Sequence, residues 1–446
     1  MRVANGLSPR VGVAGITACA VLIGCASASL PPSRATSPQH LPALFDLSAV
    51  PARPPLEWAQ HERLATRQDQ ATGRYRFVKR ADSVAGGSTT PDTNDARSYY
   101  ATGVDLIYTD PAIASAAFYW ASRIDPSWAD PYLARAFTLQ VAANSYRRRR
   151  IDGQVRTGPI PLPESTSEAI DSLAEEAYLR NPFVDDYLLM DHQATGVIGA
   201  RMLAKARGKS VPAETWRLAY GKRDWAEAAR LLDSSIARTP DAILLYVFRA
   251  HAQFYLRQHD SSAATLRSAL TRIDRRENTG GAPAHFSKAS LAYAIGIADE
   301  AAGNDSAARG AYEMAVAEKH GLYMAHLHLA STALATHDTA TAGTEAMVAS
   351  LIEPGDPEVE VFSGVTLLRA GRVSAAVAHL RAATNADPQY ALASLYLAQA
   401  LTQQHDSAGA LAAYRHFLTA SRRDDSERPI VARVMGVLSG SSPGAR

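Results

Sequence analysis

The stretch that decides the fold is "AGRVSAAVAHLRAATNADP", Ala370 to Pro388. Its only bulky apolar residues are Val373, Val377 and Leu380. Because an α-helix turns once every ~3.6 residues, this spacing places the three side chains on one helical face. The remaining positions of the helix are mostly alanine, so we expect neighbouring helices to approach it closely.

A glycine and a proline bracket this helix. Gly371 is expected at the end of the preceding helix, in the left-handed conformation that glycine adopts at little cost. Pro388 follows the last helical residues, and proline ends a helix because it has no amide hydrogen to donate. The stretch therefore predicts the second helix of a helix-turn-helix unit.

The unit repeats every 34 residues. Small residues recur in three columns at this spacing, and two prolines are also one period apart, which together indicate a repeat array. The columns are Gly296, Ala330, Gly364 and Ala398; Ala308, Ala342, Ala376 and Ala410; Ala315, Ala349 and Ala383; and Pro354 and Pro388. Four contiguous units occupy residues 289–422.

This pattern resembles the tetratricopeptide repeat, a helix-turn-helix unit of about 34 residues. The small residues match those of the family's two helices, and the prolines match its terminal proline. The family's early tryptophan is absent, and Ala292, His326, Glu360 and Ser394 stand in its place. The resemblance implies an all-α fold: a right-handed α-solenoid of tetratricopeptide helix-turn-helix repeats with a C-terminal capping helix.

Outside the regular array the units are looser, with irregular joins. Approximate units lie at 110–126, 167–182, 224–240 and 242–275, and Ile430, Val431, Val434 and Val437 predict the capping helix that a solenoid end needs. The predicted divisions are a lipoprotein signal peptide (1–24), a Pro-rich, largely disordered tether (25–95), degenerate repeats with insertions (96–288), four regular repeats (289–422), and the capping helix and tail (423–446). Within the tether, "GRYRFVKR", residues 73–80, could be a short strand or a basic patch, but we expect a solvated linker there.

The first residues read as an export signal. Arg2 and Arg10 precede an apolar run that is too short to span a bilayer well. The run ends in "LIGC", Leu22 to Cys25, which resembles the lipobox of bacterial lipoproteins. That resemblance implies cleavage before Cys25 and lipid, such as palmitate, on this residue.

Cysteine usage agrees with an exported chain. The only other cysteine is Cys19, which cleavage would remove, so the mature chain has no internal disulfide to mispair in an oxidising compartment. Ala26 follows the lipidated residue where an aspartate would favour inner-membrane retention. We therefore expect a lipid-anchored protein of the bacterial cell envelope, at the outer membrane and facing the periplasm.

The residue pattern offers no catalytic motif. There is no Gly-x-Ser-x-Gly, phosphate-binding glycine loop or His-Glu-x-x-His, and the net charge of +2 does not argue for nucleic acid. His326 and His328 diverge by about 200° on a helix, so we expect solvated side chains and no metal site. We predict no enzyme activity and no cofactor. The alternative is an enzyme or ligand site in the irregular segment 147–213.

One charge run is open to two interpretations. Arg147, Arg148, Arg149 and Arg150 end a long helical stretch. Cations are favourable at a helix C-terminus, by ~0.3–1 kcal/mol each. The run could instead contact an anionic partner, headgroup or glycan.

The expected partner surface is the inner face of the solenoid, which the first helix of each repeat lines in this family. The matching positions are Tyr293, Leu327, Val361 and Leu395, followed by Ile297, Ser331, Val365 and Gln399. This face is mostly apolar and suits an amphipathic helix or extended peptide. It lacks the lysine and asparagine pattern of members that clamp a terminal carboxylate.

Two accounts of that face remain open. It could form an open groove for a protein partner, or it could be covered by the chain's own N-terminal segment or by tight superhelical closure. For the whole chain we predict a scaffold for protein–protein interaction. A structural subunit of an outer-membrane assembly, secretion or pilus-biogenesis machine is the alternative.

Overall fold

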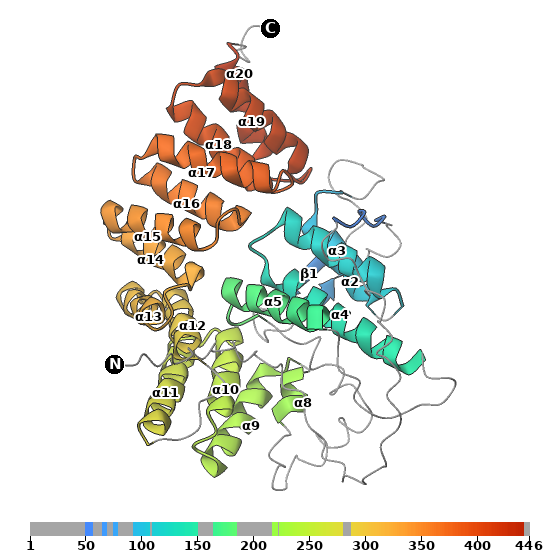
Figure 1. The fold of residues 1–446 in the computed structure, drawn as a ribbon, viewed down its shortest axis with the longest axis vertical. Helices are drawn as coiled ribbons and strands as arrows, with labels where there is room; N and C mark the ends of the chain where they lie inside the picture. Colours follow the sequence, from blue (N-terminus) through green and yellow to red (C-terminus); the bar gives the residue numbers. More distant parts are fainter. Residues whose placement is uncertain are drawn as a thin grey trace, which may run out of the picture.

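The computed structural model describes residues 50–56, 65–68, 75–78, 92–107, 109–149, 164–184, 216–221, 223–279 and 287–440. Most of these residues form helical hairpins that follow one another along the chain (Figure 1). The larger group, called the repeat arc, consists of α8 (Trp216–Gly221), α9 (Trp225–Arg238), α10 (Ile243–Tyr255), α11 (His259–Asn278), α12 (Lys288–Ala301), α13 (Asp305–Glu318), α14 (Tyr323–Ala335), α15 (Thr339–Ile352), α16 (Pro357–Arg369), α17 (Val373–Ala386), α18 (Ala391–Gln403) and α19 (Ser407–Ala420).

A second group of helices, called the N-terminal block, is the described part of residues 92–184. It contains α2 (Ala96–Leu106), α3 (Pro111–Ile124), α4 (Ala129–Arg149) and α5 (Glu164–Arg180). Before it, β1 (Ala65–Gln68) and β2 (Tyr75–Val78) pair as an antiparallel hairpin. The strand interpretation of residues 73–80 therefore matches the structure.

Every hairpin of the arc turns in the same way. The turn residue adopts a positive φ, and the following N–H donates to the carbonyl five residues before it, at 2.8–3.0 Å. This bonding satisfies carbonyls that a helix end leaves free. The turn residues are Arg223, Arg257, Gly303, His337, Gly371 and His405. Gly371 has φ 75°, as the sequence predicts.

Alanine and glycine make the repeats pack closely. Ala376 and Ala383 are fully buried, and Leu380 of the same helix lies against Gly364 of α16. First helices also pack on first helices, α14 on α16 and α16 on α18, as in a solenoid. The predicted all-α fold of stacked helix-turn-helix repeats is confirmed.

The capping helix is α20 (Arg428–Leu438), which packs on α19. Val431 is buried there and Val434 is partly buried against the same apolar cluster. Ile430 and Val437, which we expected to face the array, are 48% and 71% exposed instead. Both lie about 100–120° around the helix from Val431, off the face that packs on the array.

The arc curves around the N-terminal block. In Figure 1 the helices α8 to α20 form a bent column, and α2 to α5 lie on its inner side. Among the described residues, no helix is long and apolar enough to cross a membrane. Cys25 and the rest of the predicted signal peptide lie outside the described residues.

Candidate functional site: the inner face of the repeat arc

The predicted partner surface is only partly exposed. Tyr293, Leu327, Val361 and Leu395 are between 0% and 5% exposed and belong to the apolar cores of the arc. These four side chains are therefore part of the packing within the arc rather than an open surface. The other four positions, Ile297, Ser331, Val365 and Gln399, are half-buried.

The N-terminal block covers this face. As the block runs from its first residues to its last, it contacts the arc from the last repeat back towards earlier ones. Asn94 donates to the carbonyl of Thr419 at 2.8 Å. Further along the block, Arg123 donates to the carbonyl of Ala386 at 2.9 Å. At its end, α5 reaches α16, α14 and α12. The sequence left open whether the chain covers its own inner face, and between α12 and α19 it does so.

One position of the repeat serves as the recurring contact point. Lys319, Asp387 and Ser421 follow the last residues of α13, α17 and α19, and they are spaced by multiples of the repeat length. Lys319 pairs with Glu175 of α5 at 3.3 Å, and the carbonyl of Ser421 accepts from Asn94. The loops between repeats therefore make a ladder of polar sites along the edge of the inner face.

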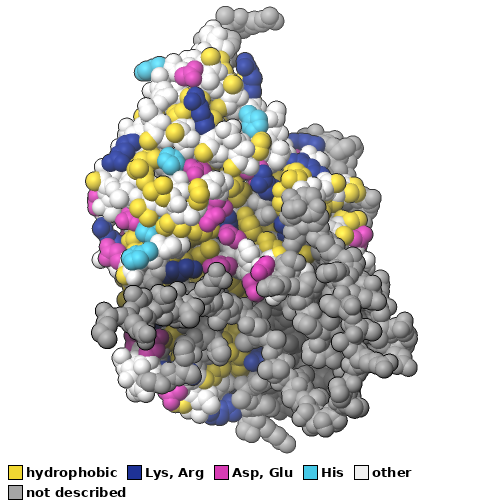
Figure 2. All heavy atoms as spheres, viewed as in Figure 1, with side chains coloured by type: hydrophobic (Ala, Val, Ile, Leu, Met, Phe, Trp, Pro, Cys, Tyr) yellow, Lys and Arg dark blue, Asp and Glu magenta, His cyan; other side chains and the backbone are white. Residues whose placement is uncertain are grey.

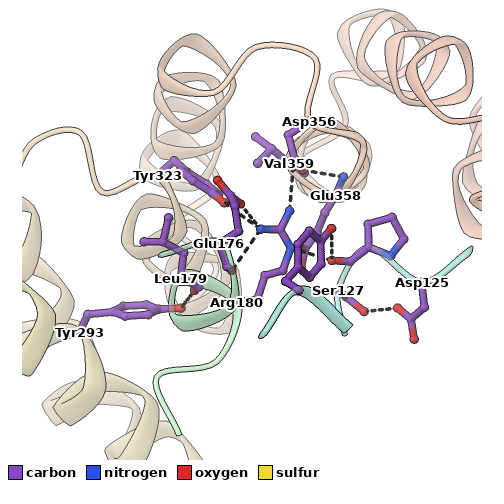
Figure 3. Close-up of polar contacts among 12 residues, drawn as sticks. Asp125, Ser127, Glu176, Leu179, Arg180, Tyr293, Tyr323, Asp356, Glu358 and Val359 are labelled. Carbon is purple, nitrogen blue, oxygen red and sulfur yellow. Dashed lines mark hydrogen bonds and ion pairs between the residues drawn. The ribbon is translucent and has the colours of Figure 1, made fainter. Parts of the chain in front are cut away.

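Arg180, the last residue of α5, makes the densest set of contacts (Figure 3). Its side chain is 1% exposed and stacks over the ring of Tyr132 at 4.4 Å. Its Nη2 donates to Asp356 at 2.8 Å, and its Nε lies 3.1 Å from Glu358 while donating to the carbonyl of Pro126 at 2.7 Å. A buried guanidinium needs such partners, because an unpaired buried charge is costly.

Tyrosine hydroxyls complete this site. Tyr323 of α14 donates to the carboxylate of Glu176 at 3.1 Å. Tyr293 of α12 donates to the carbonyl of Leu179 at 2.8 Å, so it binds a carbonyl that the end of α5 leaves free. Burial raises the pKa of both tyrosines, and both remain neutral donors at neutral pH.

Two carboxyl groups of the inner face have raised pKa values. Burial raises the pKa of Glu358 to about 8, with Arg180 opposing this shift and Asp356 adding to it. Burial likewise raises the pKa of Asp387 to about 6, although its partner Arg123 lies 2.8 Å away. Burial is the main cause of both pKa shifts, and the neighbouring arginines oppose it only in part.

The block is anchored beyond α5 by aromatic contacts that sequence patterns did not indicate. Phe183 stacks on Phe254 with ring centroids 3.9 Å apart, and the hydroxyl of Tyr255 donates to its carbonyl. His251 is fully enclosed, and burial lowers its pKa to about 4. The hydroxyl of Tyr220 can therefore donate to the neutral ring of His251. Aromatic residues spread over α8 to α10 gave no local signal for this cluster.

Upstream residues also pack on the block. Trp120 of α3 donates to the carbonyl of Pro51 at 3.0 Å, and the Arg53 guanidinium lies 4.4 Å from the same ring. Arg53 also donates to Gln389 of the arc. Residues 50–56 fall within the predicted tether, and the structure places them against α3 and the loop before α18.

The remaining candidate residues offer no catalytic arrangement. His326 bonds Glu345 at 2.6 Å and His328 bonds Glu300 at 2.9 Å, so the two rings diverge as predicted. The expectation of solvated side chains is wrong: His326 is buried and His328 is half-buried. Within the described ranges, no group of three His, Cys, Asp or Glu side chains could hold a metal.

The structure places the backbone of three of the four arginines in the run. Arg147, Arg148 and Arg149 form the C-terminal end of α4, where the sequence expects them, and Arg150 lies outside the described residues. Their side chains are also outside the description, so both interpretations of the run stay open. Most of the alternative site segment, 147–213, is likewise outside it.

Comparison with known proteins yields structural likenesses alone. No family model matches the chain, and no curated protein matches it. It is similar to YrrB, a TPR protein with an unusual peptide-binding site, at 16% identity and a TM-score of 0.37, over 46% of this chain and 99% of that one. It is similar to PilW, a type IV pilus biogenesis factor, at 14% identity and a TM-score of 0.39, over 55% and 98%. PilF from Pseudomonas aeruginosa is similar at 13% identity and a TM-score of 0.37, over 46% and 87%.

Proposed function

We propose that this chain is a lipid-anchored tetratricopeptide-type scaffold that holds a protein partner on the inner face of its repeat arc. The anchor would be lipid on Cys25, and the partner would be met in the periplasm. One observation carries the binding role: beside the block, the inner face keeps apolar side chains that retain exposed surface, one of them exposed and two half-buried. Side chains of this kind, gathered on one face, mark interaction sites.

Repeat register identifies these side chains. Leu392 of α18 lies one repeat length after Glu358, which contacts the block, so it faces the same side of the arc. It is 41% exposed. Val365 lies two turns after Glu358 on α16 and is half-buried, as is Tyr396. Figure 2 shows hydrophobic side chains interspersed with charged ones over this upper part of the arc.

The shape of this surface suits an apolar or amphipathic segment. Leu392 and Val365 come from adjacent first helices, whose axes lie ~8–10 Å apart, a distance that two successive turns of a bound helix can span. A helix placed there would bury its apolar stripe and leave its polar face in water. Turnover of a substrate is not part of this proposal.

The test replaces the exposed Leu392 and the half-buried Val365 rather than fully buried core residues. Val365→Glu combined with Leu392→Glu should abolish capture of crosslinked partner from the native envelope while the far-UV circular dichroism stays unchanged. Leu351→Glu is the matched control, because Leu351 is 79% exposed on α15, a second helix of its repeat. Full capture by the double variant would refute this binding face.

A further inference from the structure

The surface beneath the end of α5 is the strongest candidate for a second binding site. Its members from the arc are Tyr293, Tyr323, Asp356 and Glu358, which come from α12, the start of α14, and the start of α16. Together they bind a helix C-terminus that carries a buried arginine. The arc therefore already has the chemistry of a receptor for such a helix end.

We propose that α5 is an internal ligand and that the partner of the scaffold is a protein whose helix carries an arginine at its C-terminal end, which replaces α5 on this surface. This inference rests on the proposed function and names the chemistry of its partner. It concerns a surface separate from the exposed apolar side chains of α16 and α18.

The charges of the two sides support this exchange. At the two sites where an arginine of the block pairs with the arc, the arc supplies the acid: Arg180 pairs with Asp356, and Arg123 pairs with Asp387. Glu358, whose raised pKa keeps it largely protonated at neutral pH, lies 3.1 Å from Arg180. The pairs Lys319–Glu175 and Arg422–Asp95 have the opposite polarity. Charge complementarity of this kind sets which partner binds more than how tightly it binds.

The contact points also recur from repeat to repeat. Asp387 occupies the same repeat position as Glu353, which lies beside the Arg180 site. Arg123 binds both the carboxylate of Asp387 and the adjacent carbonyl of Ala386, at the C-terminal end of α17. A helix C-terminus attracts cations, so this second site would accept another arginine of the same partner.

The nature of the covering contacts makes replacement feasible. Apart from the buried Arg180 cluster, the contacts between the block and α13 to α19 include ion pairs of long side chains: Lys319 pairs with Glu175, and Arg123 pairs with Asp387. Both members of the first pair and the arginine of the second keep contact with solvent, and exposed pairs contribute little to stability. Phe183 stacks on Phe254 of α10, so the helices of the block can leave α12 to α19 while the chain stays attached at α10.

The test uses the full chain and a fluorescent peptide of residues 164–184 as the probe. In the wild-type chain the attached α5 competes at an effective concentration of about millimolar, so the peptide should bind weakly. In the Arg180→Ala chain the peptide, which keeps its arginine, should bind about ten-fold or more tightly in fluorescence anisotropy. A peptide with alanine at this position should not bind.

Two further variants, each built on the Arg180→Ala chain, test which residues bind the peptide. Arg180→Ala combined with Asp356→Asn and Glu358→Gln should lose the gain, because the receptor carboxylates are gone. The Val365→Glu and Leu392→Glu changes, added to Arg180→Ala, should leave peptide binding intact, which separates this site from the proposed partner face. If Arg180→Ala lowers helical content, Arg180→Met replaces it and keeps the stem. Equal binding by wild-type and Arg180 variant chains, or by both peptides, would overturn the inference.

Discussion

Glu360 of α16 accepts a hydrogen bond from Nδ1 of His379 on α17 at 2.7 Å. One repeat earlier the same two positions hold His326 and Glu345, with the residue types exchanged. In these two repeats the first helix and the second helix are thus joined by a polar pair. Either orientation of the pair satisfies both side chains, so the sequence can alternate.

The exchanged residue types predict how stability changes when Glu360 and His379 are swapped. Glu360→His alone places two histidines together and should lower the free energy of unfolding by about 1–3 kcal/mol, because a buried group loses its partner. Adding His379→Glu should restore about 1 kcal/mol or more, measured by urea denaturation as a double-mutant cycle. A double variant no more stable than the sum of its single changes would mean that the pair contributes nothing.

Close packing at the small residues predicts the effect of one added methyl group. A Cβ at Gly364 would lie 2.6 Å from Cγ of Leu380, so Gly364→Ala should cost about 1–3 kcal/mol of stability. Gly310→Ala is the control, because Gly310 is exposed on α13 with open space around it. That control should gain about 0.5–1 kcal/mol from helix propensity, since glycine is the poorer helix former. Thermal unfolding of both variants tests the contrast.

The recurring turn predicts a pair of opposite changes. Gly371→Ala places a side chain at φ 75° and should destabilise by about 1 kcal/mol. His405→Gly, at φ 62° in the equivalent turn of the next repeat, should stabilise by a similar or smaller amount. The denaturant midpoints of both variants, compared with wild type at an unchanged m-value, test these two stability changes. Shifts of the same sign at both sites would contradict a common turn geometry.

The raised carboxyl pKa values predict a pH dependence. The folded chain keeps Glu358 protonated up to about pH 8, whereas the unfolded chain releases this proton near its ordinary pKa of 4.5. The stability from this group is therefore fully present below the unfolded value and is lost as the pH rises through the folded value. Glu358→Gln should flatten the fall of melting temperature across that window.

Asp387 provides the internal comparison for that experiment. The pKa of Asp387 is raised from its ordinary value of 3.8 to about 6. The stability that this group contributes is therefore lost only between about pH 3.8 and pH 6. Asp387→Asn should therefore flatten only this lower part of the curve. Melting temperatures followed by circular dichroism from about pH 4 to pH 9 would show the two windows. If the wild type and both variants show the same dependence of melting temperature on pH, the assignment of these two pH windows to Glu358 and Asp387 is wrong.

The lipid anchor is tested by cell fractionation. Cys25→Ser removes the thiol that would carry the acyl chain, so the protein should move from the membrane fraction to the soluble envelope fraction. Labelling of the wild-type chain with radioactive palmitate, absent from the variant, checks the chemistry directly. A Cys25→Ser chain that stays with the membrane would contradict lipid anchoring.

The sequence by itself determined the repeat. A period of 34 residues in Gly296, Gly364, Ala376 and their equivalents specifies helix-turn-helix units, because only small side chains allow helices to approach that closely. The period also holds at Arg223 and Arg257, where the backbone takes the same turn with a residue type that gives no sequence signal. Local backbone geometry and short-range packing are written into each unit, so pattern alone could reveal them.

Only the tertiary structure decided what the repeats enclose. Arg180 lies far from Asp356 in the sequence, and no period connects the N-terminal block with the arc. Their contacts depend on the curvature that many small interhelical rotations build up, and on long side chains that reach across the inner face. For this reason the sequence could name Tyr293 as an inward position, but only the folded chain shows that the carbonyl of Leu179 is its partner.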